Sequence, residues 1–381
     1  MKQRLFVTLS LAGLAMATFG ATKPKAAIKS LNKTTIQQPT YTEWHDLQVN
    51  AINRFPLHTN FFTYPADDWV SEKDGKIVSK NILHMNKTES KYFLSLDGTW
   101  KFNWVANADQ RPTDFYKEDL DDSKWKTMNV PGNWEMNGFG DPEYVNVGFG
   151  WRGHFDQQPP AVPTKDNHVG SYRRIIDIPA NWDGKQVVAH FGSVTSNIYL
   201  YVNGKFVGYA EDSKVAAEFD ITPYLKKGKN LIAFQTFRWC DGSWDEDQDF
   251  WRLSGVARES YLFARDAKLH LEDIRVTPDL VNNYKNGVLN ISAKVKGTGK
   301  LNFILFDKEG KQVATATGLA KNGTANITMN VENPHKWSAE TPYLYTLQVS
   351  LSSALKNGNM KSASMTPVKV GFRKVEIKNK Q

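Results

Sequence analysis

The chain has 381 residues, of which 40% are hydrophobic and 12% aromatic, and its formal net charge is +8. This length predicts two or three domains, and the apolar content excludes an intrinsically disordered chain. The basic residues are scattered singly or in short pairs rather than gathered into a stripe with aromatic residues, which excludes nucleic-acid binding as the function. Cys240 is the only cysteine, so no intrachain disulfide can form.

The first residues have the pattern of a secretory signal peptide. Two basic residues precede an apolar run without charge at 5–19, and small residues place the expected cleavage between Ala17 and Ala21. A membrane anchor is the alternative, but the run is shorter than the roughly 20 residues that a spanning helix needs. We therefore expect residues 1–21 to be a signal peptide, the protein to be periplasmic or extracellular, and no membrane to be bound.

Residues 22–90 predict little regular structure. Residues 22–40 are rich in Lys, Thr, Ala and Gln, which is typical of a flexible arm. Residues 41–90 have mixed polarity without a clear period. We interpret them as an extended segment that wraps a later domain.

Residues 91–266 have the pattern of a β domain. The clearest hairpin joins Ile198–Val202 to Lys205–Val207, because Asn203-Gly204 supplies the two residues with positive φ that a type I′ turn requires. An irregular stretch at about 131–170 is dense in Gly, Pro, Asn and aromatic residues, and a loop of this length is usually functional. Other strand-like runs are Tyr92–Phe102, Val187–Val194 and Leu231–Trp239.

Residues 267–379 have a sequence pattern that differs from that of residues 91–266. Short β-like runs alternate with turn signals, which predicts an immunoglobulin-like sandwich that lacks the usual cysteine pair. The runs are Val288–Val295, Leu301–Phe306, Ala325–Val331, Leu344–Leu351 and Val368–Ile377, and the turn signals are Asn286-Gly287, Glu309-Gly310, Asn322-Gly323 and Asn357-Gly358.

One segment, Phe237–Gly255, combines acidic and aromatic residues. Carboxylates accept hydrogen bonds from sugar hydroxyls, and aromatic faces cover the apolar side of a sugar ring. Clustered oxygen ligands also suit hard cations, and a solvated acidic loop anchored by its tryptophans is the third alternative. The acids are Asp241, Asp245, Glu246, Asp247 and Asp249, interleaved with Trp239, Trp244, Phe250 and Trp251.

Complete catalytic motifs of other enzyme classes are absent from the sequence, which has no HExxH, GxSxG, Walker A or CxxC pattern. The acidic segment instead resembles the pattern R-W-x-D-G-S-x-x-E-D-Q-D-x-W-R-x-S-G of the family 2 glycoside hydrolases, and of their β-galactosidases in particular. The matching residues are Arg238, Trp239, Asp241, Gly242, Ser243, Glu246, Asp247, Gln248, Asp249, Trp251, Arg252, Ser254 and Gly255.

Other blocks similar to that family follow in the family's order, and the resemblance covers about 41–377. The insert after Asn146 departs from the pattern. The blocks are Trp44 with Ile52-Asn53-Arg54, Leu96–Trp100, Val130–Trp134 with Gly138, Tyr144–Val147, the pairs and triplets between Asn203 and Asp220, Trp337–Tyr345 and Gly371-Phe372-Arg373.

The resemblance implies an all-β chain built from a galactose-binding-like jelly roll at 91–266 and an immunoglobulin-like sandwich at 267–379. In this family a TIM barrel follows and carries two catalytic glutamates, one in an Asn-Glu motif. No Asn-Glu dipeptide occurs in this sequence. We therefore expect the barrel to be missing from the 381 residues, the catalytic glutamates to lie beyond Gln381, and this chain alone to be inactive.

Four site residues are implied by the resemblance. Asp249 matches an aspartate that binds sodium and galactose hydroxyls, and Asn146 matches an asparagine that reaches the same subsite. Asp241 resembles a ligand of a divalent ion, together with Asp46, so Na⁺ and Mg²⁺ are expected for the full-length enzyme. The plainer alternatives are an Asx-turn for Asn146 and a cap or turn role for Asp241.

The expected function is that of a β-galactosidase, which removes terminal non-reducing β-D-galactose from a β-galactoside with retention. A β-glucuronidase or β-mannosidase on the same scaffold is one alternative, and a non-enzymatic carbohydrate-binding fragment is another. Full-length members of the family are often homo-oligomers.

Overall fold

The computed structural model describes residues 38–73, 76–79, 85–146, 148, 150–151, 158–246, 249–354 and 360–377. The predicted signal peptide and nearly all of the predicted arm lie outside these residues. Across the described ranges, no helix has both the length and the apolar character needed to cross a bilayer.

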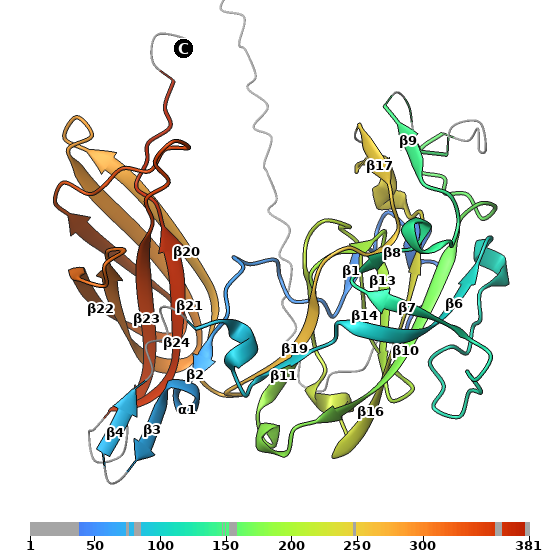
Figure 1. Ribbon diagram of the computed structural model, residues 1–381, viewed down its shortest axis with the longest axis horizontal. Helices are drawn as coiled ribbons and strands as arrows, with labels where there is room; N and C mark the ends of the chain where they lie inside the picture. Colours follow the sequence, from blue (N-terminus) through green and yellow to red (C-terminus); the bar gives the residue numbers. More distant parts are fainter. Residues whose placement is uncertain are drawn as a thin grey trace, which may run out of the picture. The chain divides into compact units, whose positions relative to one another are not determined.

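The first domain is a sandwich of two antiparallel sheets, and Figure 1 shows its long strands β6, β10 and β16 running beside one another. The larger sheet has the order β1 (Ala51–Ile52), β14 (Lys205–Ala210), β13 (Ile198–Val202), β16 (Gly228–Phe237), β10 (Val169–Ile178), β6 (Gly98–Val105) and β7 (Lys126–Val130). The smaller sheet has the order β15 (Ala217–Asp220), β11 (Gln186–Phe191), β19 (Ser260–Arg265) and β5 (Phe93–Ser95).

The core of this domain lies between the two sheets, because side chains alternate between the faces of each strand. In β6, Trp100 and Phe102 are buried while Lys101 between them is partly exposed. Phe191 and Leu262 of the smaller sheet belong to the same buried cluster. The alternation thus packs aromatic residues of one sheet against aliphatic and aromatic residues of the other.

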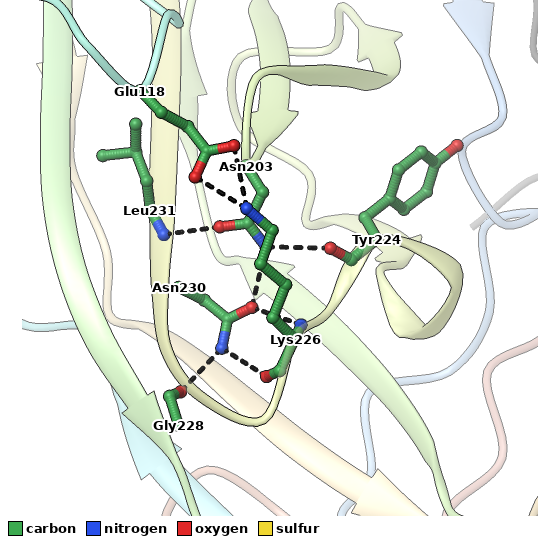
Figure 2. A network of polar contacts seen from close by, with 7 residues as sticks. All are labelled: Glu118, Asn203, Tyr224, Lys226, Gly228, Asn230 and Leu231. Carbon is green, nitrogen blue, oxygen red and sulfur yellow. Dashed lines mark hydrogen bonds and ion pairs between the residues drawn. The ribbon is translucent and has the colours of Figure 1, made fainter.

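The predicted Asn203-Gly204 hairpin is confirmed. Asn203 has φ 50° and Gly204 has φ 76°, as a type I′ turn requires. Figure 2 shows that the Asn203 side chain also ties this turn to the start of β16: its Nδ2 donates to Asn230 Oδ1 at 2.8 Å, and its Oδ1 accepts from the Leu231 backbone N–H at 2.9 Å. Asn230 in turn donates to the carbonyl of Gly228 at 2.7 Å.

Two small sheets and short turns occupy the loops of the first domain. One sheet has the order β12 (Val194–Thr195), β18 (Gly255–Val256) and β8 (Gly132–Asn133), and the other pairs β9 (Glu143–Val145) with β17 (Phe250–Arg252). The 3-10 turns are η4 (Ala108–Gln110), η5 (Glu135–Asn137), η6 (Ala180–Trp182), η7 (Thr222–Tyr224) and η8 (Asp241–Trp244).

The N-terminal segment adds strands to both domains. β1 pairs with β14 of the first domain, and β2 (Tyr64–Pro65) pairs with β24 (Met360–Val370) of the second. The segment at 41–90, expected from the sequence to wrap one later domain, thus contributes a short strand to each of two domains. The remaining elements of the segment are η1 (Glu43–His45), α1 (Ala66–Trp69), β3 (Val70–Lys73), β4 (Lys76–Ser79) and η3 (Lys87–Glu89).

The second domain is a β-sandwich built on two very long strands, β21 (Asn286–Phe306) and β22 (Gln312–Val331). The first half of β21 pairs with β20 (His270–Val281), and its second half pairs with β23 (Tyr345–Ala354). The core includes Leu289, Phe303 and Leu347, which are all fully buried. This domain has no disulfide, so apolar burial carries its stability.

The strand boundaries of the second domain differ from the sequence prediction. The runs Val288–Val295 and Leu301–Phe306 are two halves of one strand, and the break between them is a register shift after Val295 where Gly297 has φ 84°. Asn322-Gly323 lies inside β22 at the same irregularity and is not a hairpin turn. The β21–β22 turn is at Glu309-Gly310 as predicted. Asn357-Gly358 lies outside the described residues.

Candidate functional site

The ribbon formed by β9 and β17 brings Asn146 and Asp249 together. Its last cross-strand pair is Val145 with Phe250. Asn146 directly follows β9 and Asp249 directly precedes β17, so both lie at the same tip of the ribbon. Both side chains are exposed. Antiparallel pairing therefore places the two predicted sugar contacts side by side, although about a hundred residues separate them in the chain.

Two exposed aromatic residues share the ribbon with this tip. Tyr144 and Trp251 are directly opposite each other, with ring centroids 5.6 Å apart, and are 52% and 55% exposed. The Tyr144 hydroxyl donates to Asp249 Oδ1, and this hydrogen bond raises the pKa of Tyr144. An amide, a carboxylate and two open aromatic faces are the groups that a sugar ring requires.

Tyr144 was not among the predicted site residues, and Trp251 was named only as one of the aromatic residues interleaved with the acids of the 237–255 segment. Both stand inside the blocks that resemble family 2, at Tyr144–Val147 and at Asp249 to Arg252. Their exposure was the missing information, since large aromatic residues in a β domain are expected in its core.

The base of the ribbon is held by Arg238, the residue after β16. Arg238 is 3% exposed, and its Nη2 lies 3.1 Å from Oε2 of Glu143 in β9. Its Nη1 lies 3.2 Å from Nδ1 of His168. Burial, and then the charge of Arg238, lower the pKa of His168 to about 4. His168 is therefore neutral at neutral pH and can accept from the guanidinium.

A second cluster lies where η8 begins. Asp241 is 5% exposed, and one ligand atom each of Asp241, Glu211 and Cys240 lie within 4.8 Å of one another. Burial, with added repulsion from Asp241, raises the pKa of Glu211 to about 8, even though Tyr209 donates to Glu211 Oε1 at 2.5 Å. Two buried carboxylates that repel each other in this way fit a hard divalent cation, which would offset both charges.

Glu211 was not among the predicted site residues, although it stands just before the Asp212-Ser213 block. Asp46, which was predicted, is not one of the three clustered residues. Its Oδ1 accepts from the Gln48 backbone N–H at 3.0 Å in a local turn. The segment that carries Asp46 does reach the strand of the cluster, because the Glu211 backbone N–H donates to the Asn50 carbonyl at 3.1 Å.

The other acids of the segment have separate surroundings. Glu246 Oε1 accepts from the Ser213 backbone N–H at 2.8 Å, which ties the segment to the loop after β14. Asp245 follows η8 as its C-terminal cap. Asp247 and Gln248 lie outside the described residues.

The chain matches two family descriptions in succession. Residues 93–266 match "Glycosyl hydrolases family 2, sugar binding domain", and residues 269–373 match "Glycosyl hydrolases family 2". The boundary between the two matches falls between β19 and β20.

Curated relatives are similar over most of the chain. It is 37% identical over 352 residues to a protein named "Beta-galactosidase" from Priestia megaterium, a match that covers 89% of this chain and 32% of the relative. It is also 37% identical over 338 residues to a "Beta-galactosidase" from Halalkalibacterium halodurans, covering 88% of this chain and 32% of that relative. The chain thus spans about a third of the length of these relatives.

Among solved structures, the fold resembles a Bifidobacterium dentium β-glucuronidase complexed with coumarin-3-O-glucuronide. The TM-score is 0.60 at 18% sequence identity, and the match covers 75% of this chain and 49% of that one. At this identity the likeness concerns the fold alone. Together, the two family matches and the two β-sandwiches show that the chain belongs to glycosyl hydrolase family 2, with its sugar-binding domain followed by its immunoglobulin-like domain.

Proposed function

We propose that the chain is the N-terminal part of a β-galactosidase that hydrolyses terminal non-reducing β-D-galactose residues with retention. The observation that carries the proposal is the register of the β9–β17 ribbon, which puts Asn146 and Asp249 at one exposed tip. Relatives named β-galactosidase, at 37% identity over nearly nine-tenths of the chain, support this choice of sugar.

In this proposal the ribbon tip binds the galactose ring. The Asn146 amide both donates to and accepts from hydroxyls, and Asp249 accepts from them and holds a sodium ion. Tyr144 fixes the Asp249 carboxylate through its hydroxyl. Trp251 offers an indole face that is open to solvent.

Glu211 and Asp241 would hold Mg²⁺, and Asp46 would become a further ligand only by leaving the turn in which it accepts from the Gln48 backbone N–H. The ion would supply positive charge between the two buried carboxylates and so fasten η8 to the end of β14. Because both side chains are buried, this pair does not reach a sugar, and we assign it a structural role.

The catalytic carboxylates are proposed to lie outside residues 1–381, on a barrel domain. Retaining hydrolysis needs an acid/base and a nucleophile roughly 5–5.5 Å apart on either side of an accessible bond. Glu211 and Asp241 are within reach of each other but are 7% and 5% exposed, and Asp249 is the single carboxylate at the exposed tip among the residues that the structure describes there. We therefore propose that the chain by itself does not turn over substrate. We also propose export through the signal peptide and homo-oligomerisation of the full-length enzyme.

The test is hydrolysis of o-nitrophenyl β-galactoside by the 381-residue chain, beside a protein extended through the downstream reading frame. Only the extended protein should turn over, and Asp249→Asn in it should reduce kcat/KM more strongly than Asp183→Asn, a change at an exposed aspartate near β11. Turnover by the 381-residue chain alone would show that the catalytic pair lies within it.

A nitrophenyl panel separates the sibling activities. A glucuronide carries a carboxylate, which the exposed Asp249 carboxylate at the ribbon tip would repel, so the galactoside should be preferred over the glucuronide. Preference for the galactoside over the uncharged mannoside is expected from the relatives named β-galactosidase. A preference for the glucuronide would overturn the choice of sugar but not the family.

A further inference from the structure

A hollow of about 150 Å³ lies at the base of the ribbon, away from its tip. It is lined by Glu143 of β9, by Gly150-Trp151, by residues from Pro163 to His168, and by Arg238-Trp239. One water-sized group needs about 10–15 Å³, so the hollow accommodates roughly a dozen non-hydrogen atoms. That is the number of such atoms in a hexopyranose.

The polar groups of the hollow suit hydroxyls. Glu143, Asp141 and Asp166 offer carboxylate acceptors, and Arg238 and Lys165 offer cationic donors. Arg238 is 3% exposed, and its Nε is buried without a hydrogen-bond partner among the described residues. The guanidinium therefore has hydrogen-bonding capacity that its partners among these residues do not use.

The charges of the hollow nearly balance, because three carboxylates face two cations and His168 is neutral at neutral pH. The net charge of −1 disfavours an anionic ligand. A neutral molecule with several hydroxyls gains hydrogen bonds from both kinds of group.

Two tryptophans form the apolar wall. Trp151 and Trp239 meet edge to face, with ring centroids 5.2 Å apart. Gly150 lies so close to this wall that a Cβ at its position would come within 2.5 Å of the Trp239 ring. Only glycine lets the chain approach the indole this closely, so the wall depends on the sequence Gly150-Trp151.

We propose that this hollow is a second carbohydrate subsite, which binds a neutral hexose unit other than the one at the ribbon tip. Glu143 lines the hollow and Asn146 stands three residues further along, a distance of about 10 Å in an extended strand. One oligosaccharide can therefore reach both places. The identity of the sugar rests on the proposed galactosidase function, whereas the binding of a neutral hexose does not.

The experiment is a lactose titration of the 381-residue chain with ¹⁵N-labelled tryptophan, following the indole N–H signals. Trp→Phe variants assign Trp151 and Trp239. Both signals should move saturably with lactose, and sodium glucuronate should move them much less at the same concentration. Shifts confined to other tryptophans would overturn the proposal.

Rim variants test the same point without touching the core. Lys165 and Asp166 are exposed, and Asn tolerates the φ of 52° at position 166. Lys165→Ala and Asp166→Asn should each weaken lactose binding at the Trp239 signal roughly tenfold, because each change removes a charged hydrogen-bond partner of the sugar. The matched controls are Lys227→Ala and Asp183→Asn, an exposed pair 4.0 Å apart elsewhere on the domain, which should change nothing. Equal affinity in rim and control variants would overturn the proposal.

The proposed galactosidase function and the proposed second subsite can be refuted independently. Lactose binding in the hollow without galactoside hydrolysis by the extended protein would refute the galactosidase and leave the subsite standing. Hydrolysis without indole shifts would refute the subsite alone.

Discussion

Two histidines bind one buried glutamate, and removing one of them should weaken the first domain in a pH-dependent way. Glu218 in β15 is 7% exposed. Its Oε2 lies 2.9 Å from Nε2 of His58, and its Oε1 lies 2.8 Å from Nδ1 of His190. His58 belongs to the N-terminal segment, so this contact joins the segment to the sheet.

The size of the effect follows from the pKa values. Burial acts to raise the pKa of Glu218, but the hydrogen bonds from His190 and His58 prevail and lower it from 4.5 to about 2. This lowering corresponds to about 3 kcal/mol of folding stability at neutral pH. This stabilisation is present above pH 4.5 and is lost as the pH falls towards 2. The hydrogen bond to Glu218 raises the pKa of His58, so its contribution is present below 6.5 and is lost as the pH rises through the raised value. His58→Ala should therefore cost about 2–3 kcal/mol at about pH 5.5 and less at about pH 8.5.

Urea unfolding followed by tryptophan fluorescence measures this cost. Trp337 is the only one of the 12 tryptophans within 269–373, so the signal reports mainly on the first domain. His58→Gln keeps a donor but no charge, and should lie between the parent and His58→Ala at about pH 5.5. His45→Gln, a change at an exposed histidine, is the control. A loss of stability in His58→Ala that is the same at both pH values would refute the reasoning.

Three further predictions concern the metal pair, the amide network and the ribbon tip. Mg²⁺ should bind the chain more tightly at about pH 8.5 than at about pH 6, because binding displaces the proton that Glu211, with its raised pKa, still holds at the lower pH. Calorimetry in buffers of different ionisation enthalpy should detect this released proton, and Glu211→Gln should abolish the release. A pH-independent affinity would contradict a site at Glu211 and Asp241. Asn230→Ala should lower the free energy of unfolding by about 2–3 kcal/mol in the same urea experiment, because it leaves buried hydrogen-bond partners of Asn230 at the start of β16 unpaired. Glu118→Gln, which removes only the exposed ion pair with Lys226, should cost less than about 1 kcal/mol. In the extended enzyme, Tyr144→Phe should raise KM for o-nitrophenyl β-galactoside several-fold, because Asp249 loses the hydroxyl that orients it, and should leave the free energy of unfolding unchanged. An unaltered KM would show that this hydrogen bond does not form part of the sugar site.

Local sequence signals predicted the second domain less well than the first, for a specific reason. Residues that tolerate positive φ serve both tight turns and bulges inside strands. Gly297 and Asn322 have φ 84° and 42° and lie where β21 and β22 shift register, yet each reads in the sequence as a boundary. The hairpin at Asn203-Gly204 was predictable because its two strands are adjacent in the chain and no distant partner is needed to define it.

The sequence by itself determined the all-β class, the order of the two domains, and the residue types of the candidate site, because alternation, turn residues and family blocks are local patterns. Only the tertiary structure decided that Asn146 lies beside Asp249, that Asp241 meets Glu211, and that His58 reaches Glu218. Each of these contacts joins residues at least 30 positions apart in the chain. The register of paired strands and the packing of loops bring them together, and those depend on the whole folded domain rather than on any one segment.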